Sequence, residues 1–260
     1  MRALEEILSE VRGRIAAACE RSSRSADDVE IIAVTKTHGA EVVKEAYDAG
    51  LSIVAENKVQ EAMWKKESSV RGLAWHLIGH LQTNKVRHAV ETFDFIHSVD
   101  SIKLLERISS VASQLGKDVH ILLEVNVSGE MSKSGMTPEE LPMIVERALS
   151  ADRIWLEGLM TMAPFSENPE DSRPYFRRLR ELRDEMEKRF SVKLPRLSMG
   201  MSGDYEVAVE EGATWLRLGT VLFGERPKLK TVRSVCENED SFSGGLDSYS
   251  GEGPTYKIID

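Results

Sequence analysis

Lys36 is the residue whose surroundings most suggest chemistry, because it lies two residues after an apolar run at residues 31–34. A lysine beside apolar walls can lose its proton, since desolvation disfavours the ammonium ion. The resulting neutral amine can form an imine with an aldehyde. The alternative is a lysine at a rim whose charged end simply reaches water. Lys36 alone leaves both interpretations open.

Two turns rich in small polar residues could bind an anion. One covers residues 200–203 and precedes a helix that we expect to begin near Asp204; the other contains Gly219 and Thr220. Exposed backbone N–H groups at such turns attract phosphate groups. The alternative is that the glycines only serve tight connections between strands and helices. Together with Lys36, the two turns indicate a phosphorylated aldehyde as the ligand.

Other candidate motifs carry less chemistry. His76 and His80 are four residues apart, but their segment is typical of a strand entering a loop, and no acid or cysteine nearby completes a metal site. Residues 200–203 do not match the G-x-S-x-G elbow of hydrolases. Glu124 and Glu157 lie inside predicted strands, where we expect interior polar residues with local partners.

The elements that position these residues follow a regular alternation. Short continuous apolar runs, each followed by a helical pattern, predict eight parallel strands buried on both faces. They cover residues 31–34, 52–55, 76–79, 95–98, 120–125, 154–159, 196–199 and 215–218. Eight such units favour a (β/α)8 barrel. The alternative, an open doubly wound sheet, usually has a G-x-G-x-x-G turn after its first strand, and none follows residue 34.

Helix signals agree with this fold. An additional amphipathic helix is predicted near the N-terminus, over residues 4–18, and a long one ends near Phe190. Residues 137–140, Thr-Pro-Glu-Glu, indicate a helix start with an N-cap, a proline and first-turn acids. In a barrel the chemistry lies where the strands end. Lys36 and both candidate anion-binding turns therefore meet at one end.

Composition limits the function classes. The 260 residues are 41% hydrophobic and 30% charged, with a net charge of −9. This acidity argues against nucleic-acid binding, and no apolar run is long enough to cross a membrane. Glu5 and Glu6 stand where a signal peptide needs apolar residues. Cys19 and Cys236 are too few for a disulfide scaffold or a cysteine-rich zinc module, so we expect a cytoplasmic protein.

The last part of the sequence differs from the rest. Residues 231–260 are polar and acidic and show no apolar periodicity. Such a segment cannot bury enough surface to offset its chain entropy. We therefore predict a folded domain over residues 1–227 and a disordered acidic tail over residues 228–260.

The sequence resembles the family of pyridoxal 5′-phosphate (PLP) homeostasis proteins, whose barrel is similar to the N-terminal domain of alanine racemase. The matching segments extend over almost the whole predicted domain. They are residues 31–36, 56–57, 59–61, 75–85, 124–126, 133–135, 158–162, 197–202, 217–220 and 223–224.

The resemblance implies a role for each of several residues. Lys36 would carry PLP as an imine (a Schiff base), Arg217 would face the pyridine nitrogen, and Asn57 would line the cofactor. The phosphate would be held by Ser202, Gly219 and Thr220. Lys133 matches a family lysine near the site and would make a secondary cofactor contact. Lys58 stands where the family usually has tyrosine, which puts any role for that tyrosine in doubt.

The resemblance favours a cofactor carrier over an enzyme. A cationic Arg217 would disfavour protonation of the pyridine and weaken it as an electron sink. The related racemases take a second base from a separate domain, which residues 228–260 are too few and too polar to build. We therefore expect a monomer that holds PLP and exchanges it with apoenzymes or amino acids. The alternatives are a weak amino-acid racemase, an aldolase acting on a sugar phosphate through an imine, and an adaptor that works through its tail.

Overall fold

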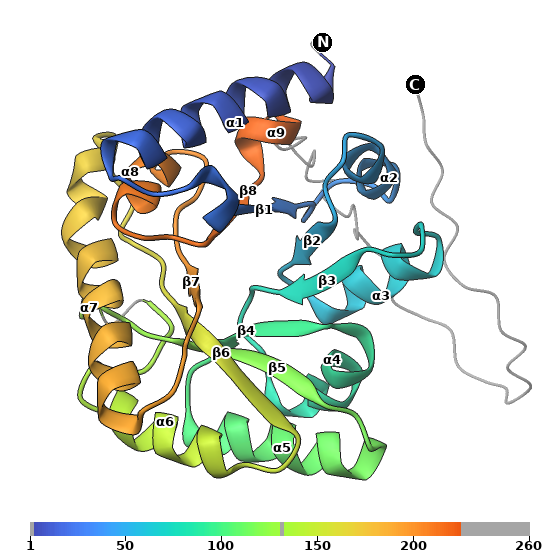
Figure 1. Cartoon of the computed structure of the whole chain (residues 1–260). Coiled ribbons are helices and arrows are strands. Elements are labelled where there is room, and N and C mark those ends of the chain that lie inside the picture. The colour runs from blue at the N-terminus through green and yellow to red at the C-terminus, as the bar shows by residue number, and fades with distance from the viewer. Residues whose placement is uncertain (1–2, 131–132, 225–260) are drawn as a thin grey trace, which may run out of the picture. The chain divides into compact units, whose positions relative to one another are not determined.

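A computed structural model describes residues 3–130 and 133–224 of the chain. Within them, eight parallel strands form a closed barrel in which β8 pairs with β1 (Figure 1). The strands are β1 (Glu30–Val34), β2 (Ile53–Glu56), β3 (Ala74–Leu77), β4 (Phe95–Val99), β5 (Val119–Glu124), β6 (Ile154–Met160), β7 (Arg196–Ser198) and β8 (Trp215–Leu218). The predicted (β/α)8 barrel is confirmed, and no strand boundary differs from its predicted position by more than two residues.

Helices surround the barrel and bury its outer face. They are α1 (Leu4–Arg21), α2 (Glu41–Asp48), α3 (Val59–Glu67), α4 (Val86–Thr92), α5 (Ile102–Leu115), α6 (Leu141–Ser150), α7 (Arg173–Phe190), α8 (Tyr205–Glu210) and α9 (Thr220–Phe223). The predicted N-terminal helix, α1, precedes the first strand and packs across α8 and α9 (Figure 1). Its apolar residues at three- and four-residue spacing form the buried face.

The strands are apolar on both faces because each face packs against a different part of the core. Ile32 and Val34 of β1 point into the barrel, whereas Ala33 between them packs against the helices. Successive side chains of a strand point to opposite faces, so both faces need apolar residues. This explains the continuous apolar runs of the sequence.

One predicted helix boundary is wrong. Residues 137–140 form a turn, and α6 begins only at Leu141, with Pro142 in its first turn. The backbone N–H of Thr137 donates to the carboxylate of Glu140 at 2.9 Å, which closes the turn. Thr-Pro-Glu-Glu is compatible with a turn as well as with a helix start.

The predicted tail, residues 228–260, lies outside the described residues. None of the helices in the described ranges has both the length and the apolar composition that a membrane crossing requires.

Candidate functional site

A cavity of about 500 Å³ opens where the strands of the barrel end. Six of the seven residues predicted to contact the cofactor line it: Lys36, Asn57, Ser202, Arg217, Gly219 and Thr220. Lys133 does not line this cavity, although its neighbour Ser134 does. Lys58 is exposed and precedes α3, so it does not occupy the place of a cavity-lining residue.

The half-buried Lys36 is carried by a tightly held segment of backbone. Lys65, fully buried on α3, donates to the carbonyl oxygen of Thr35 at 2.7 Å. The backbone N–H of Thr37 donates to Glu61 Oε1 at 2.7 Å. Thr37 has φ +67°, a left-handed conformation that β-branched residues rarely adopt. Both neighbours of Lys36 are therefore fixed by side chains of α3.

Within this support, the ammonium group of Lys65 lies between two carboxylates. Lys65 Nζ lies 2.7 Å from Glu56 Oε1 and 2.8 Å from Glu61 Oε1. Thr35 adds a hydroxyl hydrogen bond of 2.6 Å to Glu56. Burial raises the pKa of Glu56, against the opposing effect of the hydrogen bonds from Lys65 and Thr35. Burial also acts to raise the pKa of Glu61, but its hydrogen bonds to Lys65 and Thr37 outweigh burial and lower that pKa.

Arg217 on β8 is held by a series of buried hydrogen bonds. Its guanidinium group donates to Ser198 Oγ at 2.7 Å and to the carbonyl oxygen of Thr161 at 2.9 Å. Ser198 Oγ lies 3.0 Å from His97 Nδ1, and His97 Nε2 lies 3.0 Å from His76 Nδ1. Ser198 accepts from Arg217 and keeps its own hydroxyl hydrogen, which it can donate to His97 Nδ1; His97 Nε2–H then donates to His76 Nδ1.

The two histidines in this series of hydrogen bonds, His76 and His97, are uncharged at neutral pH. Burial lowers the pKa of His76 to about 3 and lowers that of His97 well below its ordinary value. The ring of Trp215 stacks on His97 with 5.1 Å between centroids. Because both imidazoles are neutral, they extend the hydrogen bonds that begin at Arg217 and Ser198 without placing further positive charge near Arg217.

Two charged groups in the cavity have pKa values shifted by burial. Arg217, 4% exposed, has its pKa lowered to about 10 and so remains a cation at neutral pH. Glu124, 2% exposed, lines the same cavity. Burial raises its pKa to about 7, with a further rise from Asp100 and an opposing effect of Arg217. Glu124 is interior as predicted, but its position in the cavity was not expected.

The two predicted anion-binding turns meet at one wall. Ser202 Oγ accepts a hydrogen bond of 3.1 Å from the backbone N–H of Val221 and thereby links the turns after β7 and β8. The serine hydroxyl still has its own hydrogen to donate. Gly200 begins the first turn with φ +92°, and a Cβ there would lie 2.5 Å from that of Ala208. Glycine is therefore required for this turn to pack against α8.

The part of the cavity formed after β2 and β3 depends on a close backbone approach. Asn57, directly after β2, lines the cavity beside Gly79 and His80 of the next unit. A Cβ on Gly79 would lie 2.3 Å from the carbonyl oxygen of Asn57, so only glycine fits. This contact sets the position of Asn57 at the cavity.

Sequence reasoning missed the residues that support this site. Lys65, Ser198 and His97 do not line the cavity, and they lie in a helix and two strands that look ordinary in the sequence. For Ser198 and His97 the sequence did carry a signal, which was a polar residue at an interior strand position, because a buried polar group needs a partner.

Comparisons with known proteins define the class of this barrel. The family described as "Alanine racemase, N-terminal domain" matches residues 10–227. A solved alanine racemase from Clostridium difficile 630 has the same fold (TM-score 0.68, 19% identity, 86% of this chain and 57% of that chain).

Nearer relatives are more specific. The pyridoxal phosphate homeostasis protein of Aquifex aeolicus is 48% identical over 222 residues, which cover 85% of this chain and 97% of that protein. The protein of the same name from Pseudomonas aeruginosa is 40% identical over 227 residues, 87% of this chain and 97% of that protein. The chain belongs to the pyridoxal phosphate homeostasis protein family.

A solved structure shows a relative with a ligand. PipY of Synechococcus elongatus, described with PLP bound, has a TM-score of 0.75 and 37% identity, over 85% of this chain and all of that one. The form of PipY described without PLP has a TM-score of 0.74 and 39% identity, over 82% of this chain and 99% of that one.

Proposed function

We propose that this chain binds PLP in the cavity at the strand ends and holds it for release, with Lys36 as the amine that takes the aldehyde. The observation that carries the proposal is that Lys36, Arg217 and the two turns line one cavity of about 500 Å³. This volume is in the usual range for a small-molecule site. The relatives' names and the PLP-bound PipY support the same ligand.

The cavity residues fit the parts of this cofactor. Ser202, Gly219 and Thr220 lie where hydroxyl and backbone N–H donors would hold a phosphate group. Asn57 would contact the ring from the part of the cavity formed after β2. Lys36 would be presented by the backbone of Thr35 and Thr37, which α3 holds in place.

Arg217 supports storage rather than turnover. When bound, PLP supplies an aldehyde for condensation with amines and a pyridine ring that withdraws electrons when its nitrogen is protonated. Arg217 would face that nitrogen as a cation, since its pKa of about 10 lies well above neutral pH. Two positive charges in contact are unfavourable, so the nitrogen would stay unprotonated.

A weak amino-acid racemase is the second candidate, because of Glu124. Its pKa of about 7 gives it comparable protonated and ionised populations at neutral pH, as general acid–base catalysis requires. Incubation of the PLP-loaded protein with one alanine enantiomer tests this candidate. Turnover above that of free PLP, and lost in Glu124→Gln, would favour the racemase.

The proposal also covers the cellular location, the oligomeric state and the partners of the protein. We propose a cytoplasmic monomer that delivers PLP to apoenzymes, with the folded domain ending at residue 227. Its net charge of −9 is unsuited to binding nucleic acids.

Reduction with borohydride followed by peptide mass spectrometry tests the proposed role of Lys36. The expected result is a PLP adduct on the peptide that contains Lys36, and its loss in Lys36→Ala. The matched control is Lys133→Ala, because Lys133 does not line the cavity. An adduct at Lys133 alone, or none in the wild type, would contradict the proposal.

A further inference from the structure

Glu124, the last residue of β5, carries a buried carboxyl group in the cavity at the strand ends. The residue is only 2% exposed. In the described part of the chain no cation forms an ion pair with this group, and no hydrogen bond contributes to its pKa. A buried carboxyl group is normally hydrogen-bonded or paired, because burial without a partner is costly. Such a cost is typical of a functional site.

The backbone holds this carboxyl group in place. The carbonyl oxygen of Glu124 accepts a hydrogen bond of 2.9 Å from the backbone N–H of Met136. The next carbonyl oxygen, that of Val125, accepts one of 2.7 Å from the hydroxyl group of Thr161. The carbonyl oxygen of Thr161 in turn accepts from Arg217 at 2.9 Å. Glu124 is therefore part of the same rigid frame as Arg217.

The charged groups around Glu124 leave it available to a cation. Burial raises its pKa to about 7; Asp100 adds to this effect and Arg217 opposes it. The guanidinium group of Arg217 is already engaged in two buried hydrogen bonds. Asp100 lies 3.3 Å from Nδ1 of His80, another residue that lines the cavity. A cation that enters the cavity would give Glu124 the partner that these groups do not provide.

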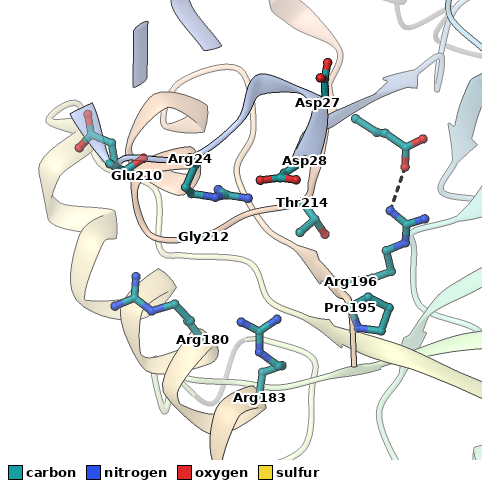
Figure 2. Close-up of a pocket in the computed structure, with 12 residues that line it drawn as sticks. Arg24, Asp27, Asp28, Arg180, Arg183, Pro195, Arg196, Glu210, Gly212 and Thr214 are labelled. Carbon is teal, nitrogen blue, oxygen red and sulfur yellow. Dashed lines mark hydrogen bonds and ion pairs between the residues drawn. The ribbon is translucent and has the colours of Figure 1, made fainter. Parts of the chain in front are cut away.

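Carboxylates in the cavity at the other end of the barrel, where β7 and β8 begin, are compensated differently (Figure 2). Arginines and carboxylates line that cavity in equal number. Glu30 Oε2 lies 3.1 Å from the guanidinium group of Arg196, and Glu210 Oε1 lies 2.6 Å from that of Arg21. These two carboxylates already have cationic partners, whereas Glu124 does not.

The proposed function requires an amine to enter the cavity that contains Lys36. PLP can pass from Lys36 to another amine only when that amine is neutral, because a free electron pair must attack. Alkylamines and amino acids carry a proton on nitrogen at neutral pH. A proton acceptor must therefore meet the amine inside the cavity. The roles assigned to Lys36, Arg217, Asn57 and the two turns leave Glu124 without one.

We propose that Glu124 binds the ammonium group of an incoming primary amine and accepts its proton, an inference that rests on the proposed function. The neutral amine then forms a bond to the aldehyde carbon. The bond between that carbon and Lys36 breaks, and its electron pair goes to the Lys36 nitrogen. The amine nitrogen passes one hydrogen to Lys36 and keeps another. The proton on Glu124 also goes to Lys36, which leaves as an ammonium group, so the charges balance.

Displacement of Lys36 by two small amines tests the proton transfer. Ethylamine is an ammonium ion at neutral pH, whereas methoxyamine is largely neutral and needs no base. Glu124→Gln should slow displacement by ethylamine about tenfold or more, and should leave displacement by methoxyamine within about twofold of the wild type. The absorbance of bound PLP follows both reactions. Glu157→Gln is the matched control and should change neither rate, because Glu157 pairs with His120 and does not line the cavity.

A second measurement uses the full chain without PLP. Above pH 7, where Glu124 is mostly ionised, ethylamine should bind saturably in a titration followed by NMR of the amine. Glu124→Gln should weaken this binding about tenfold or more, because it loses a charge-assisted hydrogen bond. Binding to the wild type should also weaken as the pH falls through 7, since protonation removes the negative charge of Glu124.

The outcomes separate this inference from the proposed function. If borohydride reduction finds no adduct on Lys36, both fail. If the adduct forms but Glu124→Gln slows the two amines equally, or slows neither, only the role of Glu124 is overturned. Equal binding of ethylamine by the PLP-free wild type and Glu124→Gln would overturn it as well. Loss of PLP loading in Glu124→Gln would also overturn it, because Glu124 would then be a contact of the cofactor.

Discussion

Glu61 Oε1 accepts a hydrogen bond of 2.7 Å from the backbone N–H of Thr37, the residue that directly follows Lys36. A side chain of α3 thus fixes the loop that follows β1. Lys65 makes the second connection, to the carbonyl oxygen of Thr35. The cavity lysine is therefore positioned by its two sequence neighbours and not only by its own contacts.

Replacement of Lys65 by methionine should lower the free energy of unfolding by about 3–5 kcal/mol, since it leaves Glu56 as a buried charge without its cationic partner. The variant should also react more slowly with PLP, because Thr35 loses its hydrogen bond to Lys65, and Glu61, which holds Thr37, loses its cationic partner. Urea unfolding and PLP absorbance measure the two effects. Lys44→Met, which breaks an exposed pair with Asp48, should cost at most about 1 kcal/mol. Equal losses in the two variants would disprove the role of Lys65.

Replacement of Ser198 by alanine removes the link between Arg217 and His97. The expected cost is about 1–3 kcal/mol of unfolding free energy, because both partners are buried and lose a hydrogen bond. PLP should still react with Lys36, whereas the absorbance of the bound cofactor should change as Arg217 loses its fixed orientation. A spectrum and a stability identical to those of the wild type would show that the chain does not act on Arg217.

Glu124 should make stability depend on pH. Its pKa is about 7 in the folded protein and about 4.5 when unfolded, so the folded state binds the proton more tightly. The stabilisation from protonation is fully present below pH 4.5 and is lost as the pH rises through 7. At pH 8, Glu124→Gln should therefore be more stable than the wild type, by up to about 3 kcal/mol, since one pKa unit corresponds to about 1.4 kcal/mol.

Unfolding of Glu124→Gln and wild type by urea at pH 4.5 and pH 8 checks this prediction. The difference between the proteins should grow with pH. Glu130→Gln, which replaces an exposed carboxylate in the same way, should show little difference at either pH. A constant difference would mean that folding does not shift the pKa of Glu124.

Replacement of Arg217 by glutamine tests why the protein would store PLP. Loss of the cation should allow the pyridine nitrogen to be protonated and so strengthen it as an electron sink. Exchange of the α-hydrogen of alanine in heavy water, followed by NMR, should then be faster than in the wild type, while Lys36 is still modified. Exchange at the wild-type rate with PLP bound would show that Arg217 does not restrain this chemistry.

The sequence was sufficient to predict the barrel and six of the residues that line its cavity, but not Glu124. Continuous apolar runs reveal strands buried on both faces, and parallel strands in a barrel all end on the same side. Lys36 and Thr220 could therefore be brought together without knowledge of the packing. Lys65 could not, because a lysine in a helix usually lies at the surface, and its burial depends on the approach of β1 and β2. The start of α6 was missed because its signals also suit a turn.

The support of Lys36 has a consequence for protein engineering. Lys36, the proposed reactive amine, belongs to the first strand-and-loop module, but the groups that hold its neighbours belong to the second, on β2 and α3. If Lys36 and its loop alone were transferred into another barrel, the loop would lose the hydrogen bonds from Glu61 and Lys65 that hold it in place. The smallest transferable unit is residues 30–67, which include Lys36 and the two side chains that hold its neighbours, Glu61 and Lys65.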